Sequence, residues 1–198
     1  MEIKWHGNTC FTLKGKGTKV LINPDKQAGS VTGNIVLSSL EETAEVKDAE
    51  KVVDWPGEYE IKGISIEGFR AWTKSKSKED EEGVGDETII YYFNMDGIKV
   101  CHLGAVGHVL TSDMVKEIGD VDILMIDLGE KSNLDGKKTM NIIEAIESRV
   151  VIPMGEGDLS ATMKELGLDK PSPEESYVVK SRSELPDDKR LTMLLKKV

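Results

Sequence analysis

The chain has 198 residues, of which 38% are hydrophobic and 31% are charged, and its formal net charge is −10. This length favours one domain over residues 1–198 with a sizeable core. The acidic balance disfavours nucleic acid as a partner, and no apolar run reaches the roughly 18 residues that a membrane-spanning helix needs, so no membrane partner is expected.

The N-terminal sequence MEIKWHG has neither the basic region nor the apolar region of a signal peptide, so a cytoplasmic location is expected. Cys10 and Cys101 lie far apart in the chain and form no CxxC pair. The simplest interpretation is two reduced, partly buried thiols without a disulfide framework.

The first half of the chain is typical of short strands separated by tight turns, because brief apolar runs are bounded by Gly, Asn or Pro. Residues 74–87 are polar and charged, which predicts an exposed, mobile loop. Asp96 and Gly97 join the apolar runs 88–95 and 98–103, the clearest hairpin in the sequence. The other expected strands cover residues 2–6, 10–15, 18–23, 34–39, 50–55, 58–63 and 64–69.

The second half changes to helical periodicity. Thr111 or Ser112 can cap a helix that ends at Gly119, apolar residues recur at helical spacing over residues 137–147, and Asp158 can cap a short helix that Gly167 ends. Strands followed by alternating strands and helices imply sheets with helices packed outside them. Strands are expected at residues 122–128, 149–154 and 190–197.

Four stretches carry a family resemblance: WHGNTCF, PGEYEIKG, DGIKVCHLGAVGH and VVIPMGE. In this order and spacing the chain resembles the metallo-β-lactamase superfamily, and within it the small prokaryotic hydrolase-like proteins related to ascorbate-phosphate lactonases. The resemblance covers nearly the whole chain. It implies an α/β (α+β) fold, a four-layer αβ/βα sandwich with a metal site along the shared edge of two sheets.

The family holds a pair of metal ions, usually zinc, with imidazoles and carboxylates, and the metals make hydroxide from a bound water. Its main ligand loop, HxHxDH, follows a buried strand, and here the same strand leads into LEETAE. The resemblance therefore implies a lost dinuclear site, with no catalytic or metal-binding residues and no cofactor. The former ligand positions are Asn23, Leu40, Glu42, Ala44, Glu45, Thr73, Ala105 and Gly155.

Three histidines remain, and they are weighed with two polar neighbours as residues of the former pocket: His6, Asn8, Asp25, His102 and His108. His102 and His108 are expected to satisfy loop or backbone hydrogen bonds, whereas His6 faces either the pocket or its strand neighbours. Glu41, Glu42 and Glu45 could contribute oxygen ligands to a hard metal, although an acidic, solvated loop is the preferred interpretation.

The expected function is a non-catalytic binding or scaffolding protein, whose partner is a small molecule or another protein. The alternative is a metal-dependent hydrolase with a relocated site, which would use zinc or another divalent metal. Edge strands of such folds favour self-association, so a homo-oligomer is compatible with the sequence. If only the ligands were lost, the backbone that once held them should persist, and restoring them should restore zinc binding.

Overall fold

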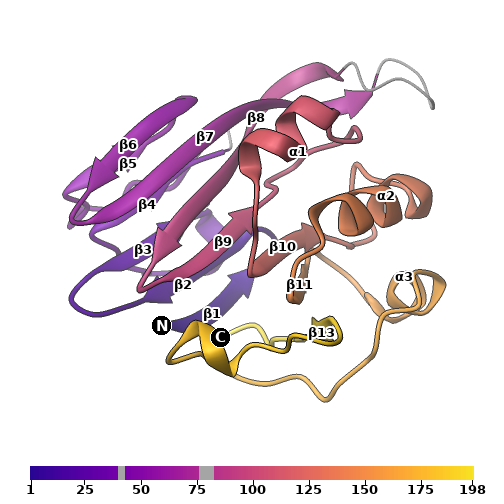
Figure 1. Cartoon of the computed structure of the whole chain (residues 1–198). Helices are drawn as coiled ribbons and strands as arrows, with labels where there is room; N and C mark the ends of the chain where they lie inside the picture. Colours follow the sequence, from indigo (N-terminus) through magenta and orange to yellow (C-terminus); the bar gives the residue numbers. More distant parts are fainter. Residues whose placement is uncertain (40–42, 76–82) are drawn as a thin grey trace.

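The computed structural model describes residues 1–39, 43–75 and 83–198, and it consists of two sheets packed face to face (Figure 1). The first sheet has the order β12-β1-β2-β3-β4-β5 and the second has the order β13-β11-β10-β9-β8-β7-β6. The first contains β1 (Glu2–Gly7), β2 (Cys10–Lys14), β3 (Lys19–Ile22), β4 (Ile35–Leu37), β5 (Lys51–Val53) and β12 (Tyr177–Val178). The second contains β6 (Gly57–Ile61), β7 (Ile64–Ser75), β8 (Gly83–Met95), β9 (Ile98–His102), β10 (Ile123–Asp127), β11 (Val150–Met154) and β13 (Leu191–Thr192).

The main core lies between the sheets. Because side chains alternate across a strand, Phe11 and Leu13 of β2 point into this core, whereas Cys10 packs on the outer face with Leu21 and Val36. The core draws buried residues from β1 at one end of the chain to Leu195 at the other, and both sheets contribute to it.

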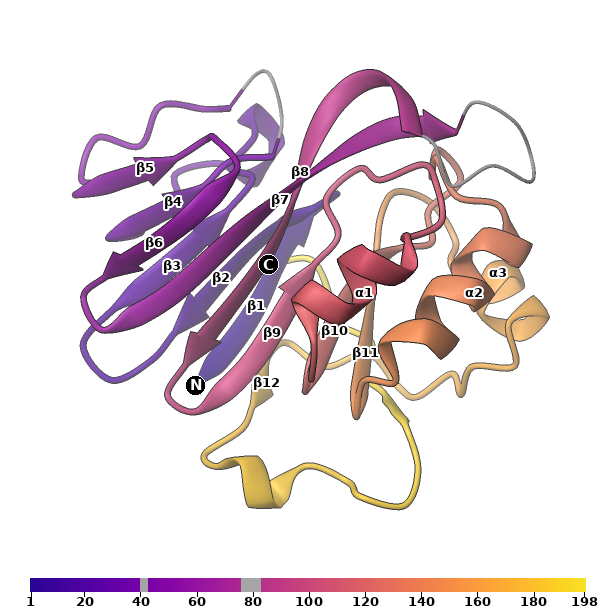
Figure 2. The same ribbon diagram turned by 45° about the horizontal axis from the view of Figure 1, so that its top comes forward.

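Three helices cover the outer face of the second sheet (Figure 2). They are α1 (Ser112–Ile118), α2 (Gly136–Ile146) and α3 (Ser160–Glu165). The predicted caps of α1 are confirmed, because Thr111 accepts a hydrogen bond from the Met114 N–H and Gly119 ends the helix at φ +68°. Helix α2 begins one residue before the predicted range, because Asp135 caps it. In the described part of the chain, no helix is long and apolar enough to cross a membrane.

The predicted metallo-β-lactamase-like sandwich is confirmed, with one local feature on the first sheet. Its outer face is covered in the described residues by the short 3₁₀ helix η1 (Lys26–Ala28) and by loop side chains such as Val31, Val46 and Ala49. The second sheet thus carries the α-helical cover, and the first carries a thinner one.

The predicted loop at residues 74–87 is wrong at both ends. Strand β7 continues to Ser75 and β8 begins at Gly83, with Lys74 paired to Val84, and residues 76–82 lie outside the described residues. A polar sequence can form a strand here because antiparallel partners satisfy the backbone on a long hairpin whose side chains stay exposed. The hairpin turn between β8 and β9 is confirmed, since Asp96 and Gly97 have φ values of +54° and +81°.

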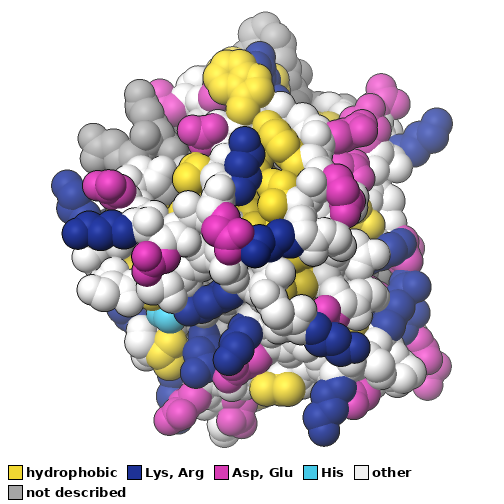
Figure 3. Space-filling model, turned by 90° about the vertical axis from the view of Figure 1, so that its left-hand side faces the viewer, with side chains coloured by type: hydrophobic (Ala, Val, Ile, Leu, Met, Phe, Trp, Pro, Cys, Tyr) yellow, Lys and Arg dark blue, Asp and Glu magenta, His cyan; other side chains and the backbone are white. Residues whose placement is uncertain are grey.

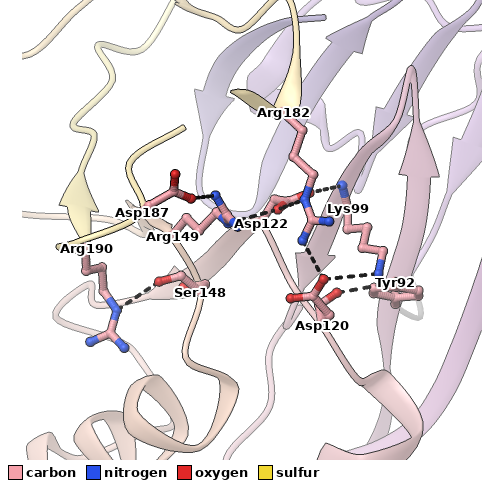
Figure 4. A network of polar contacts seen from close by, with 9 residues as sticks. All are labelled: Tyr92, Lys99, Asp120, Asp122, Ser148, Arg149, Arg182, Asp187 and Arg190. Atoms are coloured by element: carbon pink, nitrogen blue, oxygen red, sulfur yellow. Dashed lines mark hydrogen bonds and ion pairs between the residues drawn. The ribbon is translucent and has the colours of Figure 1, made fainter. Parts of the chain in front are cut away.

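The segment that follows β12, here called the C-terminal segment, is joined to the second sheet by the buried carboxylate of Asp122 (Figure 4). Asp122 is fully buried and accepts hydrogen bonds from the Lys99 backbone N–H at 2.9 Å and from Arg182 Nε at 2.8 Å. Arg149 Nε lies 3.5 Å from the same carboxylate. Beyond this point only Leu191 and Thr192 of the predicted final strand pair as β13, and the chain then crosses to β1, where Lys197 pairs with Trp5.

Candidate functional site

The carboxyl ends of β3, β4, β9, β10 and β11 meet at one end of the sandwich, which we call the strand-end edge. Pairing is parallel between β3 and β4 and among β9, β10 and β11, so the residues that follow these strands emerge on the same side. Contacts between the sheets confirm the convergence, because the Gly155 N–H donates to the Asn8 carbonyl at 3.2 Å. Open α/β sheets commonly bind ligands at such ends.

A chain of buried polar groups crosses this edge from one sheet to the other. Asn23, fully buried after β3, donates through Nδ2 to Thr9 Oγ1 at 3.1 Å and to Ser39 Oγ at 2.7 Å. Its Oδ1 accepts from the Ser39 N–H at 2.7 Å. The Thr88 hydroxyl then donates to the Ser39 carbonyl at 3.0 Å. Asn23 has φ +46°, a left-handed conformation in which asparagine is enriched.

His102, on the second sheet, is the last member of this series of hydrogen-bonded groups. The Gly104 N–H donates to Nδ1 at 3.1 Å, so the proton lies on Nε2, which donates to the Thr9 carbonyl at 3.0 Å. Burial lowers the pKa of His102 to about 4, so the ring is neutral at physiological pH. Both ring nitrogens are engaged with the backbone, as predicted, and neither is available to a metal.

We call the group of Thr9, Asn23, Ser39, Thr88 and His102 the edge network. It connects the two sheets where the family resemblance places metal ligands. Every side chain in it has a protein partner. A buried polar network that is fully hydrogen-bonded is rigid and has no need of a metal to hold it.

A hollow of about 290 Å³ opens on one side of the edge network, and we call it the strand-end hollow. Asn8, at the turn between β1 and β2, donates to Asp25 Oδ2 at 3.0 Å, and these two predicted pocket residues do lie together. Asn8, Thr9, Asp25, Asp127, Lys131, Ser132, Gly155 and Glu156 line the hollow.

Asp127 is a site residue that the sequence interpretation missed. It is the last residue of β10, and the Gly129 N–H donates to its Oδ1 at 2.9 Å. Burial raises the pKa of the Asp127 carboxyl, the hydrogen bond from Gly129 opposes this, and the nearby charge of Glu156 adds to it. The position of Asp127 at the end of a buried strand is the sequence signal that could have identified it.

Gly155 lies in a backbone arrangement that excludes a side chain. Its φ is +115°, and a Cβ placed there would lie 2.1 Å from Asp127 Oδ1 and 2.6 Å from the Gly129 nitrogen. A histidine substituted at this position would therefore clash with the present backbone, and the persistence of the ligand backbone stays a prediction. Gly129, in the loop after β10, and the Asp127 side chain occupy the space that a side chain at position 155 would need.

A second hollow of about 410 Å³ lies on the other side of the edge network, between Ser38, Ser39 and the start of the β6 hairpin. Trp55 on its rim is 64% exposed, with the Arg70 guanidinium 5.8 Å from its ring centroid. Figure 3 shows the face that carries the edge strands β5 and β6, where hydrophobic side chains form a band between charges of both signs. Val52 on β5 is 47% exposed at this face.

The structure describes only part of the predicted ligand loop. Leu40, Glu41 and Glu42 lie outside the described residues. Ala44 donates its N–H to the Pro24 carbonyl at 2.8 Å, and Glu45 is exposed, in accord with a solvated loop.

Two further former ligand positions, Ala105 and Thr73, lie within the described residues. Ala105 is half-buried, and its carbonyl accepts a hydrogen bond from Asn133 at 2.9 Å. Thr73 lies on β7 next to Gly107, and its buried hydroxyl has no hydrogen-bond partner among the residues that the structure describes.

Two histidines lie away from the strand-end hollow. His6 points to the outer face of the first sheet, where its Nε2 lies 3.0 Å from Thr12 Oγ1, so its candidacy as a residue of the former pocket is wrong. Burial lowers the pKa of His6. His108 accepts the Trp72 N–H at 3.2 Å on Nε2 and donates from Nδ1 to the Val109 carbonyl at 2.7 Å, which confirms a structural role.

These residues do not fit a dinuclear zinc centre. Within residues 1–39, 43–75 and 83–198, no group of three or more His, Cys, Asp or Glu side chains could hold a metal ion. Asn23 and His102 are committed to protein partners, and Gly155 has no room for a ligating side chain.

Comparisons with known proteins agree on the fold. Residues 2–155 match the family model described as "Beta-lactamase superfamily domain". The chain is 23% identical to a UPF0173 metal-dependent hydrolase of Methanopyrus kandleri, over 85% of this chain and 94% of that one. It is 28% identical to a UPF0173 protein of Pyrococcus furiosus, over 81% and 85% of the two chains.

A solved structure covers almost the entire chain. It belongs to a candidate Zn-dependent hydrolase of the metallo-β-lactamase superfamily from Thermotoga maritima. The TM-score is 0.78 at 26% identity, and 98% of each chain is covered. The shared architecture therefore extends past residue 155 to the C-terminal segment.

Proposed function

Because this chain belongs to the beta-lactamase superfamily, we propose that it is a binding protein built on a hydrolase fold, without the dinuclear metal centre. One observation carries the proposal: the edge network occupies the strand-end edge with Asn23 at its middle, bonded to Thr9 and Ser39. An amide that is saturated by its neighbours has no lone pair directed at a metal.

The ligand site of the proposal is the strand-end hollow. Asp25, Asp127 and Glu156 bring three carboxylates to it. Among the described residues of its lining, Lys131 carries the one ammonium group, which donates to Glu156 Oε2 at 2.8 Å. This charge balance favours a small polar molecule with a cationic group, such as an amine. Asp127 supports the choice, because a carboxylate held with a raised pKa in a hollow is typical of a functional site.

A second candidate is a metal-dependent hydrolase with a relocated site. The relative from Methanopyrus kandleri is named as a metal-dependent hydrolase, and oxygen ligands suit Mg²⁺ or Mn²⁺. The same three carboxylates would be the ligands. Their side chains would have to turn toward one point, since as they lie they form no metal-holding group among the described residues.

The Asp127→Asn variant separates the two candidates. The binding proposal expects that small amines such as putrescine and agmatine raise the thermal unfolding midpoint of the native chain, that the variant loses this response, and that neither protein hydrolyses bis-p-nitrophenyl phosphate or p-nitrophenyl esters. The hydrolase candidate expects manganese-dependent hydrolysis that the variant loses. Asp188→Asn, at an exposed position, is the matched control. Hydrolysis by the native chain that disappears only in Asp127→Asn would overturn the binding proposal.

The cytoplasmic location is part of the same proposal. Cys10 and Cys101 lie in separate clusters on the outer faces of different sheets, and burial raises the pKa of each thiol to about 12. Unreactive, buried thiols fit a reducing compartment. Non-reducing mass analysis of fresh protein is the check, and a bond between these two cysteines would contradict the proposal.

A further inference from the structure

A third hollow lies where the C-terminal segment passes α3, and it shares no lining residue with the strand-end hollow. Its volume is about 400 Å³, within the range of small-molecule pockets. We call it the C-terminal hollow. Apolar side chains form most of its wall: Trp5, Leu159, Met163, Pro173, Leu194 and Leu195.

The wall is built from well-anchored parts. Met163 and Leu195 are almost fully buried, and Trp5 is fixed because its indole Nε1 donates to the Asn8 carbonyl at 2.9 Å. The end of the chain is held beside Trp5, since the Val198 N–H donates to the Trp5 carbonyl at 3.0 Å. A preformed apolar hollow of this kind binds ligands without a large ordering penalty.

The charges around the hollow are mostly positive, although the chain has a net charge of −10. Of the described residues, three lysines and one carboxylate line it, namely Lys170, Lys196, Lys197 and Asp158. Asp158 is directed at the start of α3, where it accepts the Ser160 N–H at 2.9 Å. Among the described residues, no ion pair involves Lys196 or Lys197.

We propose that the C-terminal hollow binds an amphipathic anion, namely a free carboxylate with an aliphatic chain, with the chain against the apolar wall and the carboxylate at Lys196 and Lys197. The argument is charge complementarity: an apolar ligand body needs the wall, and the two lysines lack a carboxylate partner in the described part of the chain. This site lies beyond the proposed function of the strand-end hollow and does not depend on it.

The chain length of the ligand tests the apolar part. We expect isothermal titration calorimetry to give one site per chain for decanoate, octanoate and hexanoate, with affinity falling about fourfold for each methylene removed. Decyltrimethylammonium, which has the same alkyl chain and the opposite charge, is expected to bind far more weakly than decanoate. Quenching of tryptophan fluorescence by decanoate that disappears in Trp5→Phe would place the ligand beside Trp5.

The polar part is tested by substitutions on the rim. The double variant Lys196→Gln/Lys197→Gln is expected to weaken decanoate binding about two- to fivefold for each lysine removed. Pro173→Glu, which adds a carboxylate at an exposed part of the rim, is expected to weaken it as well. Lys180→Gln/Lys189→Gln, at exposed positions outside the hollow, is the matched control and is expected to bind decanoate normally.

Several results would overturn the proposal. They are the absence of saturable decanoate binding to the folded native chain, equal binding of decyltrimethylammonium, and unchanged affinity in both rim variants. A change of oligomeric state in the rim variants, seen by gel filtration without a change in decanoate affinity, would assign the hollow to contact between copies of the chain instead.

Discussion

Replacing Asn23 with alanine removes the middle of the edge network. The Ser39 N–H and the Thr9 hydroxyl lose their partners at 2.7 Å and 3.1 Å, in a place where Asn23 itself is fully buried. Each buried polar group left unpaired costs about 1–3 kcal/mol. Alanine at φ +46° adds about 1 kcal/mol of backbone strain. The expected loss in the free energy of unfolding is therefore about 3–7 kcal/mol.

Urea denaturation at pH 7, followed by tryptophan fluorescence, measures this loss. Asn94→Ala, at an exposed position on β8, is the control and is expected to change stability by less than about 0.5 kcal/mol. Added zinc is expected to leave the midpoint of Asn23→Ala unchanged. A loss below about 1 kcal/mol, less than one unpaired group should cost, would refute the reasoning that this network holds the edge together.

Three further changes test other parts of the structure. The His102 pKa falls from 6.5 to about 4 on folding, so the unfolded chain takes up the proton first as the pH is lowered. The free energy of unfolding should therefore fall by about 3 kcal/mol between pH 6.5 and pH 4. Urea titrations across that range should show a shallower fall for a His102→Gln variant. Gly155→Ala should lower the free energy of unfolding by about 3 kcal/mol or more in urea denaturation, because backbone strain and a backbone clash combine. Gly17→Ala, at φ +88° in open space, should cost only the strain. Equal losses would contradict the close packing of the loop after β10 against Gly155. Asp122→Ala should lower the free energy of unfolding by about 2–4 kcal/mol, because hydrogen bonds to a buried charge are lost. Asp187→Ala, at the exposed rim of the same network, should lower it by almost nothing. A small loss for Asp122→Ala would show that this carboxylate does not anchor the C-terminal segment.

Local chemistry made much of the fold predictable. Thr111 and Gly119 bound α1 as their side-chain and backbone preferences require, and Asp96-Gly97 forms the expected turn. The extension of β7 and β8 into residues 74–87 was not predictable from composition, because it depends on pairing between two polar segments. The outward direction of His6 could have been predicted from strand alternation, since it has the opposite parity to the core residue Ile3.

The site was less predictable than the fold. The sequence shows which residue occupies each family position, but the partners of Asn23 depend on how β2, β3 and β4 are juxtaposed. The exclusion of a side chain at Gly155 depends on the path of the loop after β10, and so does the environment of Asp127. These are tertiary properties that no local pattern encodes.

The metal content of the native chain tests the central claim most directly. Protein purified without a chelator and without a metal-affinity tag is analysed by inductively coupled plasma mass spectrometry, and its urea denaturation is compared with and without EDTA. Because the edge network holds the strand-end edge with protein hydrogen bonds alone, we expect metal well below one ion per chain and an unchanged denaturation midpoint. Stoichiometric zinc, manganese or iron, with a midpoint that falls when EDTA removes it, would contradict the claim.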